Sequence, residues 1–214
     1  MLQFTSFSKK YGNVKILDLG DYLLPDGIVW LKGINGAGKS TLLSCAAGLL
    51  PFSGDIALRS TGQSLKKDSI EYRQKVSFSE ADPIFPGFLT GKEIIAFFRA
   101  AKGGSKQQAD DLIALFEANT FIHQVTATYS SGMNKKLSLI LAFIGLPSVI
   151  LLDEPLVTLD QHAQVALLSL IEKKLAQNCH IMVSSHHTLT LSPPIAIQEL
   201  FLENASLQDD STQI

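Results

Sequence analysis

The stretch Gly33-Ile34-Asn35-Gly36-Ala37-Gly38-Lys39-Ser40-Thr41 matches the pattern G-x-x-x-x-G-K-[ST] in full. It follows an apolar run at residues 28–31 and leads into a helix-compatible run at residues 40–47. Its glycines permit backbone conformations that turn successive N–H groups inward around an anion. The helix that follows adds the positive end of its dipole. This order of strand, loop and helix predicts a cradle for the phosphates of a nucleotide.

The side chains of this phosphate-binding loop have separate expected roles. Lys39 should bring its charge to the β- and γ-phosphates, which makes it a candidate catalytic residue, and the Ser40 hydroxyl should ligate Mg²⁺. A Gly-rich turn is the alternative, but such a turn does not require a strand before it and a helix after it. The other nucleotide-binding residues predicted here are Gly33, Asn35, Gly36, Ala37, Gly38 and Thr41.

Composition favours one globular domain, with room for a small inserted lobe. The chain has 214 residues, 46% of them hydrophobic, and a formal net charge of -2. It is therefore neither disordered in character nor basic enough for a nucleic-acid-binding face, so no nucleic-acid partner is expected. Cys45 and Cys179 suit two buried, reduced thiols rather than a disulfide framework.

The sequence predicts a cytoplasmic protein. Residues 1–7 lack the charged and apolar regions of a secretory signal. The most apolar window, residues 137–152, is interrupted by Gly145 and Pro147 and is too short to span a bilayer. Any membrane role would therefore require another chain.

A second chemical motif is Val149-Ile150-Leu151-Leu152-Asp153-Glu154-Pro155, an unbroken apolar run that ends in two carboxylates. Such a run is typical of a strand buried on both faces of a parallel sheet. Beside the phosphate-binding loop, Asp153 could hold Mg²⁺ through its water shell, and Glu154 could orient and deprotonate the attacking water. A strand that simply ends in a charged turn is the alternative, and it is disfavoured because a nucleotide-bound metal needs an acidic partner.

Helices are expected between these two motifs. Thr90 can cap a helix with Glu93 three residues on, and residues 105–116 form a second helical pattern. Strands are predicted at residues 2–7 and 76–78, and a final hairpin at residues 198–207. The helical segment between the strands exceeds an ordinary crossover, so it predicts an insert of about fifty residues or more.

The stretch Tyr129-Ser130-Ser131-Gly132-Met133-Asn134-Lys135-Lys136-Leu137 resembles the signature motif of ATP-binding cassette (ABC) ATPases, usually Leu-Ser-Gly-Gly-Gln. Ser130 and Gly132 match that form, while Tyr129, Ser131 and Met133 differ. A Tyr-Ser-x-Gly-Met variant is familiar in ATPases of small exporters. Ser130 could cap the helix that begins near Gly132 and so aim a second helix N-terminus at a phosphate. A serine-capped surface helix is the alternative.

The resemblance covers nearly the whole chain and implies an α/β P-loop NTPase fold. The core sheet should be mostly parallel, with an antiparallel β part at the N-terminus. One ABC ATPase domain should span residues 1–214, with a nucleotide-binding core at about 1–78 and 145–214. A helical subdomain should occupy about 79–144, inserted between the P-loop and Asp-Glu strands. ATP and Mg²⁺ are the implied cofactors.

Three further residues gain roles through the resemblance. Tyr11 matches the aromatic residue that stacks on adenine, and Asp160 belongs to the loop that communicates between paired ATPases. His186 resembles the switch histidine that contacts the γ-phosphate, and its position after a strand of residues 181–183 suits that role. His187 is the less favoured neighbour.

One family element is missing. The glutamine expected after the strand at residues 76–78 aligns best with Ala81, between Glu80 and Asp82. In the family this glutamine senses Mg²⁺ and water and links to the membrane subunit. Coupling or hydrolysis is therefore expected to be altered.

The implied function is ATP hydrolysis that powers an ABC transporter, with an exporter favoured by the signature variant. Families of this kind clamp two ATP molecules between head-to-tail subunits, so a second ATPase subunit, identical or related, is expected. A separate transmembrane permease would hold the chain at the inner face of the membrane. The alternatives are a soluble ABC ATPase of a non-membrane machine and a regulatory subunit that hydrolyses poorly.

Residues 79–89 are predicted to dock the permease, together with the face of the following helix. The segment is interrupted by Pro83 and Pro86 yet carries Ile84, Phe85, Phe88 and Leu89. Apolar side chains in such a loop have few partners within their own secondary structure, so a second protein should cover them. The alternative is that they pack under the helical lobe.

Overall fold

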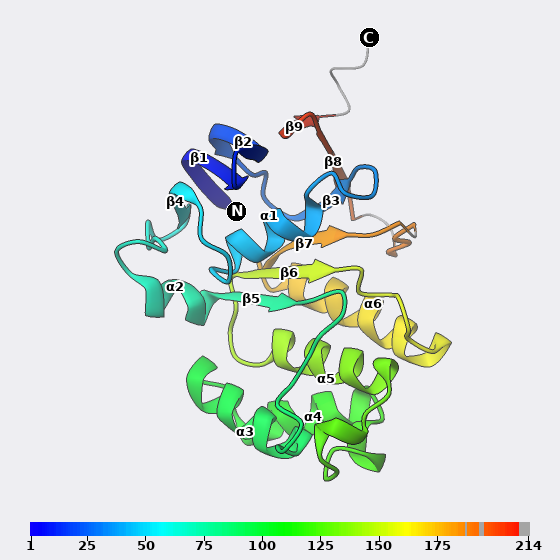
Figure 1. The fold of residues 1–214 in the computed structure, drawn as a ribbon. Coiled ribbons are helices and arrows are strands. Elements are labelled where there is room, and N and C mark those ends of the chain that lie inside the picture. Colours follow the sequence, from blue (N-terminus) through cyan, green and yellow to red (C-terminus); the bar gives the residue numbers. More distant parts are fainter. Residues whose placement is uncertain (187, 193–194, 210–214) are drawn as a thin grey trace.

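In the part of the chain that the structure describes, six strands form the central sheet (Figure 1). The structure is a computed structural model that describes residues 1–186, 188–192 and 195–209. The strand order is β5-β6-β7-β3-β8-β9, and each neighbouring pair is parallel except β8–β9. The mostly parallel sheet and the final hairpin are therefore as predicted. The strands are β3 (Ile28–Lys32), β5 (Val76–Ser79), β6 (Val149–Asp153), β7 (His180–Ser184), β8 (Ile197–Glu203) and β9 (Ser206–Asp209).

A smaller antiparallel sheet comes from the N-terminal part of the chain. Its order is β2-β1-β4, formed by β1 (Leu2–Tyr11), β2 (Val14–Leu23) and β4 (Ser53–Leu58). Strand β4 lies tightly against β1 at Gly54, whose φ is +92°. A Cβ there would lie 2.4 Å from the Thr5 carbonyl oxygen, so this position has no room for a side chain. The predicted antiparallel N-terminal part is thus present.

Strand β6 illustrates how the core is divided into two layers. Val149 and Leu151 pack in one cluster with the small sheet and α1 (Lys39–Ala46). The alternate residues of the strand, Ile150 and Leu152, pack in another cluster with the helices on the opposite face. Successive side chains of a strand point to opposite faces, so an unbroken apolar strand joins both layers. Helix α1 accordingly lies between the two sheets, and the remaining large helices lie below the central sheet (Figure 1).

The predicted helical insert lies between β5 and β6 in the chain. It contains α3 (Gly91–Lys102), α4 (Lys106–Leu115) and α5 (Ser131–Phe143), with short 3₁₀ turns η1 (Ala118–Thr120) and η2 (Thr126–Thr128). Thr90 caps α3 as predicted: its hydroxyl oxygen accepts from the Glu93 amide at 3.3 Å, and the Glu93 carboxylate accepts from the Thr90 amide at 2.8 Å. This reciprocal capping box explains where α3 begins.

Two helices complete the fold. Helix α6 (Gln161–Ala176) crosses between β6 and β7, and α2 (Ser69–Lys75) precedes β5. Helix α2 lies in a polar stretch and was not predicted. It is held by buried Tyr72, whose hydroxyl donates to the Ala46 carbonyl at 2.8 Å. Tertiary contact rather than local pattern therefore fixes this helix.

The two cysteines are buried thiols, as predicted from the sequence. Cys45 and Cys179 are both free and buried, and burial raises the pKa of each thiol to about 11. Within the described ranges, none of the helices has the length and apolar character needed to cross a bilayer.

Candidate active site

The P-loop turns sharply between β3 and α1. Gly33 has φ of +148°, and a Cβ at this position would lie 2.7 Å from the Leu202 carbonyl oxygen. Gly38 has φ of +105° and precedes the first residue of α1. Because backbone conformation restricts both positions to glycine and close packing restricts Gly33 further, the motif spacing is a structural requirement of this turn.

The start of α1 is suited to bind an anion. Gly38 occupies the N-cap and has no side chain, so no capping oxygen at that position competes for the first amides of the helix. The Lys39 ammonium lies over the loop and donates to the carbonyl oxygens of Gly33 at 2.7 Å and Ile34 at 3.1 Å. Amide donors, an ammonium and the adjacent Ser40 and Thr41 hydroxyls form the donor set that phosphate oxygens require.

Most of the predicted site residues share one cavity of about 600 Å³. Its lining consists of Tyr11, Ile16, Asn35, Gly36, Gly38, Lys39, Ser40, Thr41, Asp153, Glu154, Val157 and His186. Gly33 and Ala37 do not line this cavity. Gly33 supports the loop against β8, and Ala37 packs on the hydrophobic cluster beneath it. The structure therefore joins the P-loop, the paired carboxylates and His186 in a single concavity, which we call the P-loop cavity.

The paired carboxylates lie at the end of β6. Asp153 is buried and accepts a hydrogen bond from the Ser184 hydroxyl of the neighbouring strand. Glu154 adopts φ of +43°, a left-handed conformation that is uncommon for residues other than glycine. The Glu154 amide donates to the Ser184 carbonyl at 2.9 Å, which holds this turn in place. Backbone strain of this kind is concentrated at functional sites, and here it directs the second carboxylate into the cavity.

His186 faces Glu154 across the cavity. Its amide donates to Glu154 Oε2 at 3.3 Å, and its Nε2 lies 3.5 Å from Glu154 Oε1. The segment that carries His186 is held by Trp30, whose indole nitrogen donates to the Ser185 carbonyl at 2.9 Å. Trp30 was not identified from the sequence. The available signal was a tryptophan within an apolar strand, because a buried indole N–H needs a hydrogen-bond acceptor and so indicates a contact with another segment. His187 lies outside the described residues.

The signature residues lie elsewhere. Ser130 caps α5, and its hydroxyl oxygen accepts from the Met133 amide at 3.2 Å. A Cβ on Gly132 would lie 2.9 Å from the Thr158 carbonyl oxygen, so the signature helix and the loop after β6 touch within one chain. Ser130, Gly132 and Asp160 line a second, polar concavity of about 1080 Å³, which we call the signature concavity. The structure does not bring these three residues to the P-loop cavity of the same chain.

Asp160 connects the signature helix to α6. Its carboxylate pairs with Lys136 at 2.6 Å and accepts from the Ala163 amide at 2.8 Å, which caps α6. The hydrogen bond from Lys136 and that from the Ala163 amide hold the pKa of this largely exposed carboxyl below its usual range. Asp160 is therefore an ionised side chain at the edge of the signature concavity.

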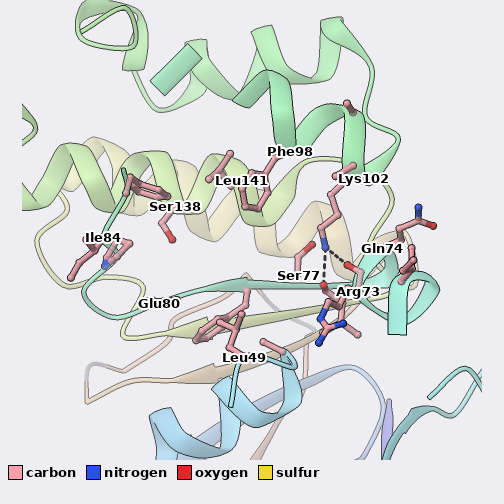
Figure 2. A pocket seen from close by; sticks show the side chains of 18 residues that line it. Leu49, Arg73, Gln74, Ser77, Glu80, Ile84, Phe98, Lys102, Ser138 and Leu141 are labelled. Atoms are coloured by element: carbon pink, nitrogen blue, oxygen red, sulfur yellow. Dashed lines mark hydrogen bonds between the residues drawn. The ribbon is translucent and has the colours of Figure 1, made fainter. Parts of the chain in front are cut away.

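A third concavity of about 620 Å³ separates the helical insert from the core. We call it the apolar groove; Figure 2 shows Leu49 on the core side, with Phe98 of α3 and Leu141 of α5 facing it. Ile84 also lines the groove and is 90% exposed. Phe88 is exposed but is not among the lining residues.

The apolar side chains of the loop after β5 divide into two groups. Ile84 and Phe88 lie at the surface. Phe85 and Leu89 instead pack on the hydrophobic cluster of the helical insert. Phe85 and Leu89 are thus partly covered by the insert, and Phe85 also lines the apolar groove. The alternative of packing under the helical lobe holds in part for these two residues, and the docking of a partner stays a prediction.

A family model described as ABC transporter matches residues 21–157, which include the P-loop, the signature segment and the Asp-Glu pair. The chain belongs to the ABC transporter family. As an ABC ATPase it is an ATP-binding enzyme that hydrolyses ATP as a transporter subunit. The fold class predicted from the sequence is likewise confirmed by solved ABC ATPases.

Two curated relatives give the extent of the similarity. The chain is 31% identical over 198 residues to the "Cytochrome c biogenesis ATP-binding export protein CcmA" of Legionella pneumophila (strain Lens), covering 90% of this chain and 96% of that protein. It is 31% identical over 169 residues to the "ABC-type transporter ATP-binding protein EcsA" of Bacillus subtilis (strain 168), covering 77% and 68%. Both alignments extend over most of the two chains compared.

Solved structures agree with the fold. One described as "Structure of ATP binding subunit of ABC transporter" has a TM-score of 0.85 and 25% identity, and covers 99% of this chain and 90% of that one. A dimeric post-hydrolysis state of the ATP-binding cassette MJ0796, bound to ADP and Pi, has a TM-score of 0.80 with 19% identity and 98% coverage of both chains. The second likeness concerns the fold alone.

Proposed function

We propose that the P-loop cavity binds Mg²⁺ together with ATP and carries out hydrolysis. Lys39 and the loop amides would bind the phosphates, with Tyr11 placed against the base. Ser40 and Asp153 would hold Mg²⁺, which supplies neutralisation of phosphate charge when bound. The single observation that carries this proposal is the convergence of these residues in one cavity.

Glu154 is the proposed general base. Its carboxylate projects into the cavity from a strained backbone position, where it can accept the proton of an attacking water. His186, with Nε2 at 3.5 Å from that carboxylate, would orient the carboxylate and contact the γ-phosphate. The proposed roles of Glu154 and His186 therefore both depend on the short distance between the two side chains.

The two polar concavities support a composite site. Ser130, Gly132 and Asp160 face outward in their own concavity rather than toward the P-loop of the same chain. A second ATPase subunit, identical or related, would bring its signature concavity against the P-loop cavity with ATP between them. ATP binding would then close the pair, and hydrolysis would reopen it.

The apolar groove is the proposed contact with a separate transmembrane permease. It lies between the nucleotide-binding core, proposed to comprise about residues 1–78 and 145–214, and a helical subdomain at about 79–144. Its surface-exposed apolar members, Leu49, Ile70 and Ile84, suit a short amphipathic helix. Such a partner would hold the chain on the cytoplasmic face of the membrane.

Export is the proposed direction of transport. The Tyr-Ser-x-Gly-Met form of the signature and the similarity to an ATP-binding export protein favour it. Ala81, at the position of the expected glutamine, favours a second candidate, a regulatory subunit with slow hydrolysis. The turnover number of the purified chain, with and without a permease, separates these two candidates.

Co-purification with a permease tests the docking proposal. A polytopic membrane protein encoded next to this chain would be the permease to test. Ile84→Asp places a charge in the groove on a 90% exposed side chain, so we expect the folded subunit to lose association with the permease. Val165→Asp, on an exposed position of α6 outside the groove, is the matched control. If Ile84→Asp associates as strongly as Val165→Asp, the permease binds elsewhere.

A further inference from the structure

Lys135 is an unusual residue of the signature helix. It lies in the second turn of α5, and its side chain is fully buried. Its ammonium donates to three main-chain carbonyls, those of Glu80 at 2.6 Å, Ala81 at 3.0 Å and Asp153 at 2.9 Å. An ammonium has three N–H donors, so these partners use its full capacity.

The three carbonyls belong to two different segments. Glu80 and Ala81 directly follow β5, whereas Asp153 ends β6, and the two strands are parallel neighbours in register at Ser79 and Leu152. Lys135 therefore binds both segments at the edge of the sheet where the strands end. The buried hydroxyls of Ser79 and Ser138, 2.9 Å apart, add a second link between β5 and α5.

These two segments lead to different functional regions. Beyond Ala81 the chain enters the loop that carries Pro83 and Ile84 into the apolar groove. Beyond Asp153 it reaches Glu154, whose φ is +43°. The Lys135 ammonium is thus the point at which the groove loop and the carboxylate turn share one hydrogen-bonding partner.

An apolar side chain at this position would have a smaller free-energy cost of desolvation than the Lys135 ammonium has. Burial lowers the pKa of Lys135 to about 8, against the favourable influence of Asp153, Asp82, Glu154 and Glu80. A buried ammonium is costly unless its donors are satisfied, and here satisfaction depends on the two segments staying in place. Displacing either segment would leave a donor of a buried cation unpaired, so Lys135 resists such displacement.

We propose that Lys135 is a positioning residue for ATP hydrolysis, which holds the Glu80-Ala81 main chain against the end of β6 and thereby fixes the Asp153-Glu154 pair relative to the P-loop. The inference rests on the proposed roles of Asp153 and Glu154. It predicts that losing the ammonium affects turnover more than nucleotide binding, because the P-loop contacts do not involve Lys135.

Steady-state ATP hydrolysis by the purified full chain tests this role. Lys135→Met keeps an unbranched side chain that extends as far as Cε but removes the ammonium donors. Its kcat should fall about 10- to 100-fold, as when supporting partners of a catalytic group are removed. KM for ATP should stay within about twofold. Lys135→Arg, which retains a cation with several donors, should recover part of the lost kcat.

Lys174→Met is the matched control, since Lys174 is also a buried lysine but lies on α6 away from the cavity. Its kcat should match that of the native chain. A native kcat in Lys135→Met would overturn the inference, as would a parallel loss of kcat in Lys174→Met. If Lys135→Met does not fold, Lys135→Gln decides on the same kcat and KM criteria.

Glu154→Gln, assayed in parallel, separates this inference from the site assignment. If Glu154→Gln loses turnover while Lys135→Met retains it, the positioning role alone is wrong. If Glu154→Gln also hydrolyses ATP at the native rate, the assignment of the carboxylate pair is wrong, and the role built on it is overturned with it.

Discussion

The P-loop cavity and the signature concavity each adjoin the N-terminus of a helix, but the two N-termini differ. At α1 the N-cap is Gly38, which offers no side chain, so the first amides remain open to an anion. At α5 the N-cap is Ser130, whose hydroxyl already accepts from the Met133 amide. The first N-terminus therefore leaves its amides open to a phosphate. In the proposed composite site, the second would present a hydroxyl and a close backbone to a ligand held by another subunit.

The comparison predicts unequal effects on binding and turnover when either side is changed. Within the P-loop cavity, the loop residues should control the affinity of one chain for ATP, and the carboxylate turn should control the chemistry. Residues of the signature concavity should affect turnover with little effect on the affinity of one chain for ATP. Three substitutions test this division.

Glu154→Gln should have the largest effect. The amide keeps the shape of the side chain but does not accept a proton from water, and loss of a general base lowers kcat by about 10²- to 10⁴-fold. ATP affinity, measured by equilibrium binding, should be unchanged because Glu154 is not part of the P-loop. Native turnover in this variant would place the base elsewhere.

Lys39→Ala should weaken ATP binding itself. Removing a charged hydrogen-bond donor to phosphate costs about 1.5–3 kcal/mol, which corresponds to an affinity loss of about 10- to 100-fold. Isothermal titration of the variant against the native chain measures this loss. Unchanged affinity would mean that the phosphates are bound without the P-loop lysine.

Gly132→Ala should give a smaller and more selective effect. The added Cβ would lie 2.9 Å from the Thr158 carbonyl oxygen, so the loop carrying Asp160 must shift. We expect kcat to fall by about tenfold, since small displacements at a reacting centre are costly. ATP affinity of the single chain should not change. Ser131→Ala, at the exposed neighbouring position, is the control, and equal kcat in the two variants would remove Gly132 from the site.

The sequence was most informative where one continuous segment of the chain forms a structural feature by itself. The P-loop needs glycines at fixed spacing because consecutive amides must converge, and β6 needs an unbroken apolar run because both its faces are covered. Both requirements leave a continuous pattern, so the fold class and the grouping of the P-loop with the carboxylates could be predicted.

Features assembled from distant segments left no such pattern. Helix α2 depends on a hydrogen bond from Tyr72 to the last residue of α1. The segment that carries His186 depends on the indole nitrogen of Trp30 in β3, which donates to the Ser185 carbonyl. Lys135 reads as one member of an ordinary lysine pair until the structure reveals that it is buried beneath two loops. Each of these contacts joins residues far apart in the chain, which a reading of local periodicity does not relate.

We propose that the P-loop cavity is half of a site that the signature concavity of a second subunit completes. Light scattering of purified Glu154→Gln with ATP and Mg²⁺ tests it most directly, because blocked hydrolysis should trap the closed pair. We expect a shift from the 23.2 kDa monomer to a dimer that is less populated when Gly132→Ala is added and absent when ATP is withheld. An ATP-bound species that remains at the monomer mass, alone and with a related ATPase chain, would contradict it.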